Sequence, residues 1–141
     1  PHVIEPTFGM DRIFLAVLAN AYHYDKERGN VVLRIHPKLA PVKAGVFPLV
    51  NKLEDKAREV FDAVKLLFPS QYDRSGSIGR RYARADETGI PFCATIDFDT
   101  LKDNSVTIRD RDTMEQVRVK INELGQKLSG LISGAEKLSS K

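Results

Sequence analysis

The sequence predicts an α/β fold in which a mixed β-sheet is flanked by helices in roughly three layers. One observation is the order of its segments, which runs strand, helix, strand, helix, strand, strand, helix. A second is the contrast between long segments with apolar residues at helical spacing and short apolar or alternating segments between them. A third is the length of 141 residues, which allows one substantial core but leaves little room for two complete domains.

The first part of the chain reads as a piece of a preceding domain. We expect residues 1–5 to be the end of a strand and residues 8–22 to be a helix. Residues 25–30 are charged and end in Gly-Asn, which is typical of a turn, and residues 31–35 suit a short strand. The helix carries a broad apolar stripe made of Phe8, Ile13, Phe14, Val17, Leu18, Ala21 and Tyr22.

The central part of the chain predicts two helices that alternate with strands. A buried strand at 42–49 leads to a helix at 52–68, which should stop at Pro69. The turn Ser75-Gly76-Ser77 can cap a helix over 78–88. Gly89 and Pro91 should then close that helix.

The last part of the chain predicts a hairpin and a helix. Residues 92–98 and 106–111 alternate as strands do and should pair across a polar loop at 99–104. Thr113-x-x-Gln116 has the pattern of a capping box and predicts that a helix opens there. Residues from about 133 onward are small, polar and basic and should fray. The apolar residues of this helix would be Val117, Ile121, Leu124, Leu128 and Leu131.

Composition excludes several classes of protein. The sequence has no run of about 18 apolar residues, so no membrane span is expected. The single cysteine, Cys93, lies in an apolar segment and reads as a small buried side chain in a reducing cytoplasm. The three histidines have no ligand spacing, so no metal site is expected.

Charge is mixed rather than uniformly basic. The net charge is +3, and residues 97–115 hold six acidic residues against three basic ones. Residues 116–141 reverse this balance, with five basic and two acidic residues. A nucleic-acid partner would therefore be recognised locally, by both signs of charge, rather than by a general polycation.

Arg109 and Arg111 are the first candidates for binding. Side chains alternate along a strand, so both arginines should lie on one exposed face while Val106 and Ile108 point to the core. The alternative is that they form surface ion pairs, including one to Asp97 on the neighbouring strand.

The predicted helix at 78–88 supplies a second group of cations. Arg80 and Arg84 are four residues apart and should be neighbours, whereas Arg81 points elsewhere. Tyr82 between them suits either stacking on RNA or packing in the core.

The junction near the beginning of the chain combines a carboxylate, a hydroxyl and a guanidinium group. Glu5 suits an amine and Arg12 suits a polyphosphate, with Thr7 between them. The same residue types also occur at ordinary capped helix starts, so the pattern by itself leaves both interpretations open.

Several long motifs together resemble one family. Residues 1–12, with Pro1-His2-Val3-Ile4-Glu5-Pro6, Phe8-Gly9 and Arg12, resemble motif 3 of the class II aminoacyl-tRNA synthetases in its glycyl version. Residues 75–87 (SGSIGRRYARADE), 95–100 (TIDFDT) and 106–118 (VTIRDRDTMEQVR) resemble the anticodon-binding domain of glycyl-tRNA synthetases of the archaeal/eukaryotic type. These motifs follow in order and cover the chain to about residue 125.

The resemblance implies roles for individual residues. Arg12 falls on the motif 3 arginine that holds ATP, so it is the catalytic candidate, and Glu5 falls on the glutamate that holds the glycine amino group. Thr7 stands where a serine is usual and keeps the hydroxyl. Arg111 matches a strand arginine that reads the anticodon. The anticodon-binding candidates are Arg109, Arg111, Asp97, Glu115, Arg80 and Arg81.

The resemblance also implies an organisation. Residues 1–24 would be the tail of a class II catalytic domain, 25–41 a connector, and 42–141 the anticodon-binding domain. The parent enzyme would use ATP and Mg²⁺ to join glycine to tRNA(Gly), as a cytoplasmic homodimer. Motifs 1 and 2 are absent from these residues, so we expect the chain alone to be inactive and to hold no cofactor.

Recognition of cytosine offers an independent argument. Glycine codons begin with two guanines, so the anticodon presents two cytosines, each with an N4 donor beside N3 and O2 acceptors. A reader needs carboxylates together with arginine or lysine, which the region 109–112 with Asp97 and Glu115 supplies. The alternatives are a non-catalytic paralogue that binds nucleic acid or protein through the same fold, and a generic small-ligand α/β domain.

Overall fold

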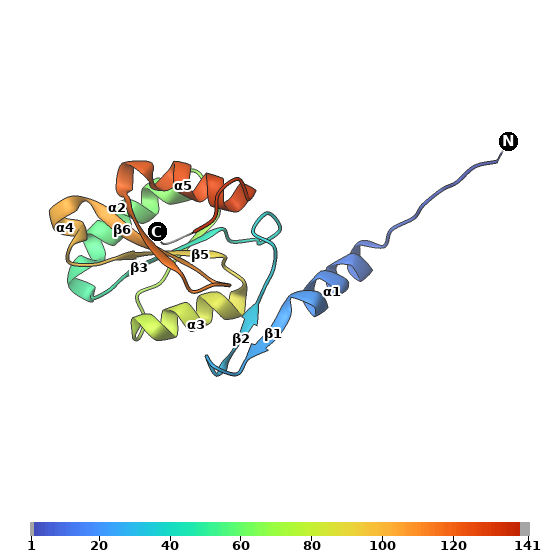
Figure 1. Cartoon of the computed structure of the whole chain (residues 1–141), viewed down its shortest axis with the longest axis horizontal. Coiled ribbons are helices and arrows are strands. Elements are labelled where there is room, and N and C mark those ends of the chain that lie inside the picture. The colour runs from blue at the N-terminus through green and yellow to red at the C-terminus, as the bar shows by residue number, and fades with distance from the viewer. Residues whose placement is uncertain (1, 139–141) are drawn as a thin grey trace.

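The computed structural model describes residues 2–138 and shows a five-stranded mixed sheet with helices on both faces (Figure 1). The strand order is β4-β3-β5-β6-β7. Strand β3 pairs in parallel with β4 and β5, whereas β6 pairs antiparallel with β5 and β7. The predicted α/β class is confirmed. The strands are β3 (Ala44–Pro48), β4 (Ser70–Tyr72), β5 (Phe92–Ile96), β6 (Ser105–Asp110) and β7 (Gln116–Lys120).

Each face of the sheet has its own helices. Helices α2 (Glu54–Lys65) and α5 (Ile121–Ser133) lie over one face, and α3 (Ile78–Thr88) lies over the other (Figure 1). The larger core lies under α2 and α5, where inward residues of the strands meet apolar helix faces. Its fully buried members include Val46, Ala57, Val60, Ala94, Ile96, Val106, Ile108, Leu124 and Leu128.

Local signals explain the limits of the helices. A 3-10 turn at Asn51–Leu53 leads into α2. Helix α3 begins after Ser77, whose hydroxyl oxygen accepts a hydrogen bond from the backbone N–H of Arg80 at 3.4 Å. It ends at Gly89, which has a φ of 80° in the left-handed region where glycine is favoured. The predicted helix 78–88 is confirmed at both ends.

The capping box at Thr113 was a wrong prediction. Residues 116–120 form the edge strand β7, and α5 begins only at Ile121. The turn before β7 is closed by Asp110, whose carboxylate accepts from the backbone N–H groups of Asp112 and Thr113, and by Met114 in the left-handed region. The prediction was misled because Val117, Ile121 and Leu124 are spaced by four and three residues, as in a helix. Val117 and Val119, however, are two residues apart, which is the strand period.

Three smaller segments also differ from the prediction. Residues 2–5 have no regular structure where the end of a strand was expected, and Pro1 lies outside the described residues. The polar loop at 99–104 contains one helical turn, α4 (Thr100–Asp103), in which Thr100 is buried. Strand β4 was not foreseen because it is only three residues long. Part of the predicted frayed end, residues 139–141, lies outside the described residues.

The N-terminal part projects from the sheet. It consists of an extended segment at 2–9, helix α1 (Met10–Ala21) and a hairpin of β1 (Tyr22–Asp25) and β2 (Asn30–Leu33) (Figure 1). The hairpin packs on α3, but α1 points away from the sandwich. Among the described residues, no helix has the length and apolar character needed to cross a membrane.

Candidate nucleic-acid interface

The predicted exposed arginine pair is buried. Arg109 is 6% exposed and Arg111 is 1% exposed. The predicted alternation along β6 is confirmed, because Val106 and Ile108 enter the larger core. The opposite face of this strand is covered, however, by α3 and by the segment after β2. Arg109 and Arg111 therefore do not form an exposed surface.

Arg109 is bound to the helix that covers it. Its two terminal nitrogens donate to the two carboxylate oxygens of Asp86 at 2.9 and 3.0 Å. Its guanidinium carbon lies 4.7 Å from the ring centre of Tyr82. Burial lowers the pKa of Arg109, but the hydrogen bonds and charge of Asp86 outweigh burial and raise it above its ordinary value. Arg109 thus joins β6 to α3.

Arg111 joins three segments of the backbone. It donates to the carbonyl oxygens of Gly89 and Ile35, both at 2.9 Å. It also donates to both carboxylate oxygens of Asp112, at 2.9 and 2.7 Å. A planar guanidinium group suits this arrangement because its donors point in fixed directions.

The two arginines of α3 lie in opposite environments. Arg80 is exposed at the first turn of the helix. Arg81 is 3% exposed and donates to the carbonyl oxygens of Pro48 and Gly76. Tyr82 packs against Phe47 and donates to or accepts from the hydroxyl of Thr95, so it belongs mainly to the core.

Asp97 pairs with Arg118, a residue that the sequence prediction missed. Arg118 donates to the two oxygens of Asp97 at 2.6 and 3.0 Å, and its side chain is about one-third exposed. The hydrogen bonds from Arg118, opposed by burial, lower the pKa of Asp97 to about 2. Those same bonds raise the pKa of Arg118. Asp103 approaches Arg118 at 3.4 Å and extends the ion-pair network.

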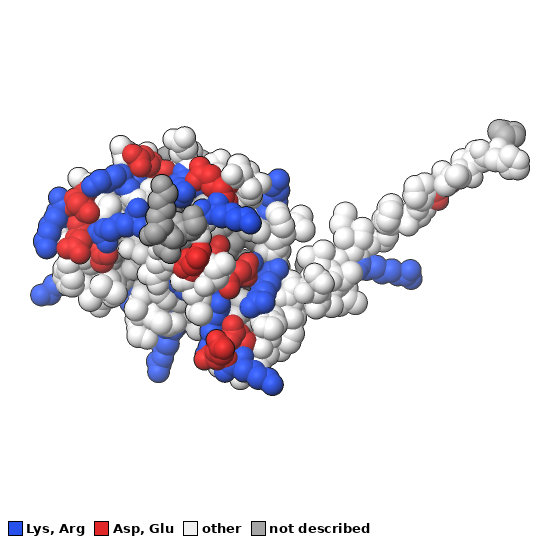
Figure 2. Space-filling model, viewed as in Figure 1, with Lys and Arg blue, Asp and Glu red and all other residues white. Residues whose placement is uncertain are grey.

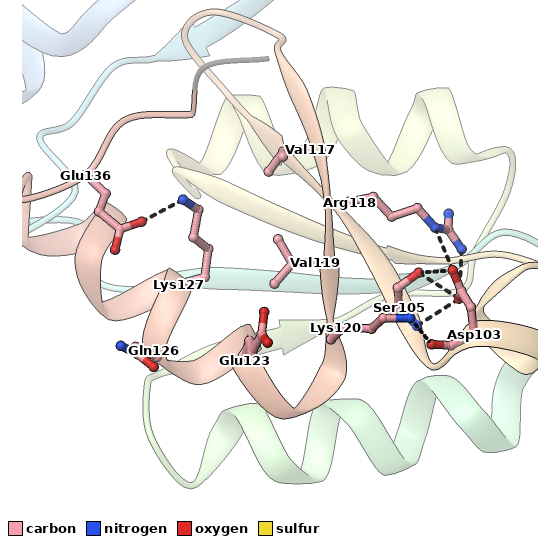
Figure 3. Close-up of a pocket in the computed structure, with 10 residues that line it drawn as sticks. All are labelled: Asp103, Ser105, Val117, Arg118, Val119, Lys120, Glu123, Gln126, Lys127 and Glu136. Carbon is pink, nitrogen blue, oxygen red and sulfur yellow. Dashed lines mark hydrogen bonds and ion pairs between the residues drawn. The ribbon is translucent and has the colours of Figure 1, made fainter. Parts of the chain in front are cut away.

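These residues lie on a part of the sheet that α3 leaves open. Arg118 projects from the opposite side of β7 to Val117 and Val119, which point toward α5 (Figure 3). Thr107 on β6 lies opposite Arg118 in the strand register, and Gln116 on β7 is exposed. We call the surface formed by Asp97, Thr107, Gln116 and Arg118 the open face. It offers acceptors and donors side by side.

A groove runs along the same edge strand, and its lining includes Arg118 as well as residues that face α5. It has a volume of about 570 Å³ and lies between β7 and α5 (Figure 3). Lys120 donates to the carbonyl oxygen of Asp103, and Lys127 pairs with Glu136 at 2.6 Å. Positive and negative side chains therefore alternate along this end of the molecule, as Figure 2 shows.

The remaining candidates stand apart from the open face. Glu115 is exposed in the turn before β7. Glu5 and Thr7 are exposed on the extended segment, and Arg12 is exposed on α1. No group of three or more His, Cys, Asp or Glu residues within 2–138 is placed to hold a metal ion.

The sequence is similar to known proteins over most of its length. Residues 43–131, more than half of the chain, match the family model described as "Anticodon binding domain". A glycine–tRNA ligase of Caldanaerobacter subterraneus subsp. tengcongensis is 53% identical over 130 residues, which is 91% of this chain and 28% of that protein. Those of Clostridium acetobutylicum and Malacoplasma penetrans are 54% and 52% identical over 127 residues, 88% of this chain and 28% of each.

The extent of these matches defines what the chain is. It spans little more than a quarter of the length of the curated relatives, and the family model covers the whole sheet from just before β3 into α5. The chain therefore belongs to the anticodon-binding domain family.

Proposed function

We propose that the open face binds the anticodon loop of tRNA(Gly) and reads its two cytosines. The observation that carries this proposal is the Asp97–Arg118 pair, which places a carboxylate beside a guanidinium on an accessible strand surface. Cytosine needs an acceptor for its N4 amino group and donors for N3 and O2. Asp97 supplies the first and Arg118 the second, when a base takes the place of part of their mutual pairing.

The other candidates divide by accessibility. Arg80 and Glu115 are exposed and suit contacts to the flanking backbone or to a further base. Direct reading by Arg81, Arg109 or Arg111 would require each to give up buried hydrogen bonds. We therefore propose that these three arginines support the open face from inside the sandwich and do not read bases directly. The cost of leaving a buried carbonyl or carboxylate unpaired supports this division.

We further propose that the chain is part of a glycine–tRNA ligase of the archaeal/eukaryotic type, a cytoplasmic homodimer that uses ATP and Mg²⁺. Residues 1–24 would end its catalytic domain, 25–41 would connect, and 42–141 would bind the anticodon. Glu5 would hold the glycine amine, Thr7 would lie beside it, and Arg12 would hold ATP. Because these three side chains are exposed and motifs 1 and 2 are absent from these residues, this chain alone should not catalyse ATP–pyrophosphate exchange.

The anticodon proposal is tested by binding two RNA stem-loops, one with the glycine anticodon and one with its two cytosines replaced. Arg118→Ala should weaken binding of the first by about 1–3 kcal/mol and change binding of the second little, because a base contact depends on sequence. Lys65→Ala on α2, on the opposite face of the sheet, is the matched control and should affect both RNAs equally and weakly.

The variant Arg111→Ala distinguishes a residue that reads the anticodon from one that supports the fold. If Arg111 supports the fold, its replacement should lower the thermal stability of the protein along with its affinity for RNA. The reason is that the carbonyl groups of Gly89 and Ile35 lose their donor. The proposal fails if Arg118→Ala weakens both RNAs alike. It also fails if Arg111→Ala keeps full stability while losing only the cytosine-containing RNA.

A further inference from the structure

The hairpin turn between β1 and β2 carries an arginine that reaches into the sandwich. Arg28 is only 10% exposed although it lies in a four-residue turn. It donates to the carboxylate of Asp86 at 3.3 Å and to the carbonyl oxygen of Arg111 at 2.7 Å. It also donates to the carbonyl oxygen of Asp112 at 3.2 Å. One side chain therefore contacts both α3 and the end of β6.

The turn that carries Arg28 is closed by its own hydrogen bonds. The carboxylate of Asp25 accepts from the backbone N–H groups of Glu27 and Arg28, at 3.0 and 3.1 Å. Its other oxygen lies 3.2 Å from Nε of Arg28, an ion-pair contact rather than an aligned hydrogen bond. Gly29 completes the turn with a φ of 68°. Arg28 thus reaches Asp86 and the end of β6 from a hydrogen-bonded turn.

Arg28 shares a buried carboxylate with a second arginine. Asp86, which is 2% exposed, accepts from Arg28 and from Arg109. Removing Arg28 would leave Asp86 with one cationic partner, whereas the other buried contacts of β6 would remain. The effect of its loss should therefore fall on the hairpin rather than on the sheet.

The hairpin in turn fixes the direction of α1. Helix α1 ends at Ala21 and β1 begins at Tyr22 without a linker. The backbone N–H of Arg34, just after β2, donates to the carbonyl oxygen of Ala21 at 2.7 Å, so both ends of the hairpin are tied to the base of α1. Contacts between the sandwich and α1 itself are few, because residues 10–16 are exposed. Leu18 and Ala21 at the end of α1 also pack with Ile35 and Ala40, so the hairpin and this small apolar cluster together orient α1.

We propose that Arg28 is a positioning residue for tRNA charging, an inference that rests on the proposed function. It holds the hairpin, and with it Arg12 on α1 and Glu5 and Thr7 on the extended segment, in a fixed relation to the open face. A tRNA bound by its anticodon then presents its acceptor end to the active site in the productive orientation. Arg28 itself touches neither the anticodon nor the substrates.

The test compares Arg28→Ala, Arg28→Lys and Arg34→Ala in the complete ligase that contains this chain. Arg34 is the matched control, because it lies just past the same hairpin, is 42% exposed and only approaches Asp112, at 3.9 Å. Arg28→Ala should lower kcat/KM of charging for tRNA on the order of 10- to 100-fold, since small misplacements of reacting groups have effects of this size. Arg28→Lys should lose less, because lysine keeps the charge but not the fork of donors.

Two readouts distinguish positioning from general damage. Glycine-dependent ATP–pyrophosphate exchange without tRNA, and affinity for the anticodon stem-loop, should both stay at wild-type levels in Arg28→Ala. Hydrogen exchange of the β1 and β2 amides should become faster while that of β5 and β6 stays slow.

Each other outcome overturns the proposal. Unchanged charging by Arg28→Ala would remove the positioning role, and parallel loss of charging, exchange and stem-loop binding would reduce Arg28 to a stabilising residue. An equal loss in Arg34→Ala would show that charge alone matters. If the wild-type ligase itself does not charge tRNA(Gly), the proposed function fails, whatever the variants do.

Discussion

The two ends of this chain use apolar residues in opposite ways. In the sandwich, Val46, Ile108 and Leu128 are fully buried between the sheet and its helices. In α1 and the segment before it, Phe8 and Phe14 are 78% and 63% exposed, and Figure 2 shows this part as mostly uncharged surface. An apolar surface without a partner marks an interface. The sandwich buries its apolar residues between its own elements, whereas we predict that the N-terminal part forms an interface with another surface.

Polar groups show the same contrast. Buried arginines of the sandwich are paired inside it, as Arg109 is with Asp86, while Arg12 on α1 is exposed and has no hydrogen-bond partner among the described residues. The boundary between the two modes is the β1–β2 hairpin, where Arg28 already makes buried contacts. The hairpin therefore belongs structurally with the sandwich, whereas most of α1 is exposed.

The largest effect should come from breaking the buried pair. Asp86→Ala leaves Arg109 buried without a carboxylate and Arg28 without one of its acceptors, so it should lower the free energy of unfolding by about 3–5 kcal/mol. Urea unfolding followed by circular dichroism measures this loss. Asp62→Ala removes an exposed carboxylate paired with Lys65 and should cost less than about 1 kcal/mol. Similar losses in both variants would contradict the importance of burial.

The sequence predicted the elements whose signals are local. Helix α3 was found from Ser77 at its start and Gly89 at its end, and α2 from its apolar face, since both signals lie within about 15 residues. Strand β7 was missed because Val117, Ile121 and Leu124 also fit a helical spacing. Only pairing with β6, which the sequence does not display, decides that residues 116–120 are extended.

The site was predicted less well because its geometry depends on distant segments. The alternation that puts Arg109 and Arg111 on one face of β6 was correct, but what covers that face comes from residues 33–36 and from α3. Arg28 could not have been found, because the carbonyl group that it binds is 83 residues away in the sequence. Arg118 could have been found as a polar residue between Val117 and Val119, had the strand period been recognised.

A smaller effect is expected on the stability of the fold at acidic pH. The folded-state pKa values of Asp97 and Asp103 are lowered from 3.8 to about 2, by hydrogen bonds from Arg118 and from Ser105 respectively. Groups with a depressed pKa stabilise the fold above the unfolded value, and this contribution is lost as the pH falls from about 4 to about 2. Arg118→Ala should therefore flatten the pH dependence of unfolding across that window. At neutral pH its cost should stay near 1 kcal/mol or less, because the pair is partly exposed.

Urea titrations of the wild type and Arg118→Ala at several pH values between about 2 and 7 measure this difference. Lys102→Ala, whose pairing with Asp99 is exposed at 3.2 Å, is the control and should leave the slope unchanged. If the two variants have the same slope as the wild type, the Asp97–Arg118 pair contributes nothing to the fold.

The smallest effect on the stability of the sandwich should come from removing the exposed N-terminal segment. Deletion of residues 1–16 should change the free energy of unfolding by less than about 0.5 kcal/mol, because residues 2–16 are exposed and contribute nothing to the core. The same deletion should abolish self-association, since the exposed stripe that includes Phe8, Ile13 and Phe14 is then gone. Sedimentation at rising concentration should show dimers or larger species for the full chain and monomers for the shortened one.

Phe14→Ser separates the stripe from the rest of the segment. This substitution keeps the length and the charge of the chain while removing a side chain that is 63% exposed. It should weaken association and leave the unfolding of the sandwich unchanged, because no member of either core under the sheet touches it. A full chain that stays monomeric at all concentrations would mean that the stripe does not associate by itself. A loss of sandwich stability in Phe14→Ser would mean that α1 is part of the folded unit and not an association surface.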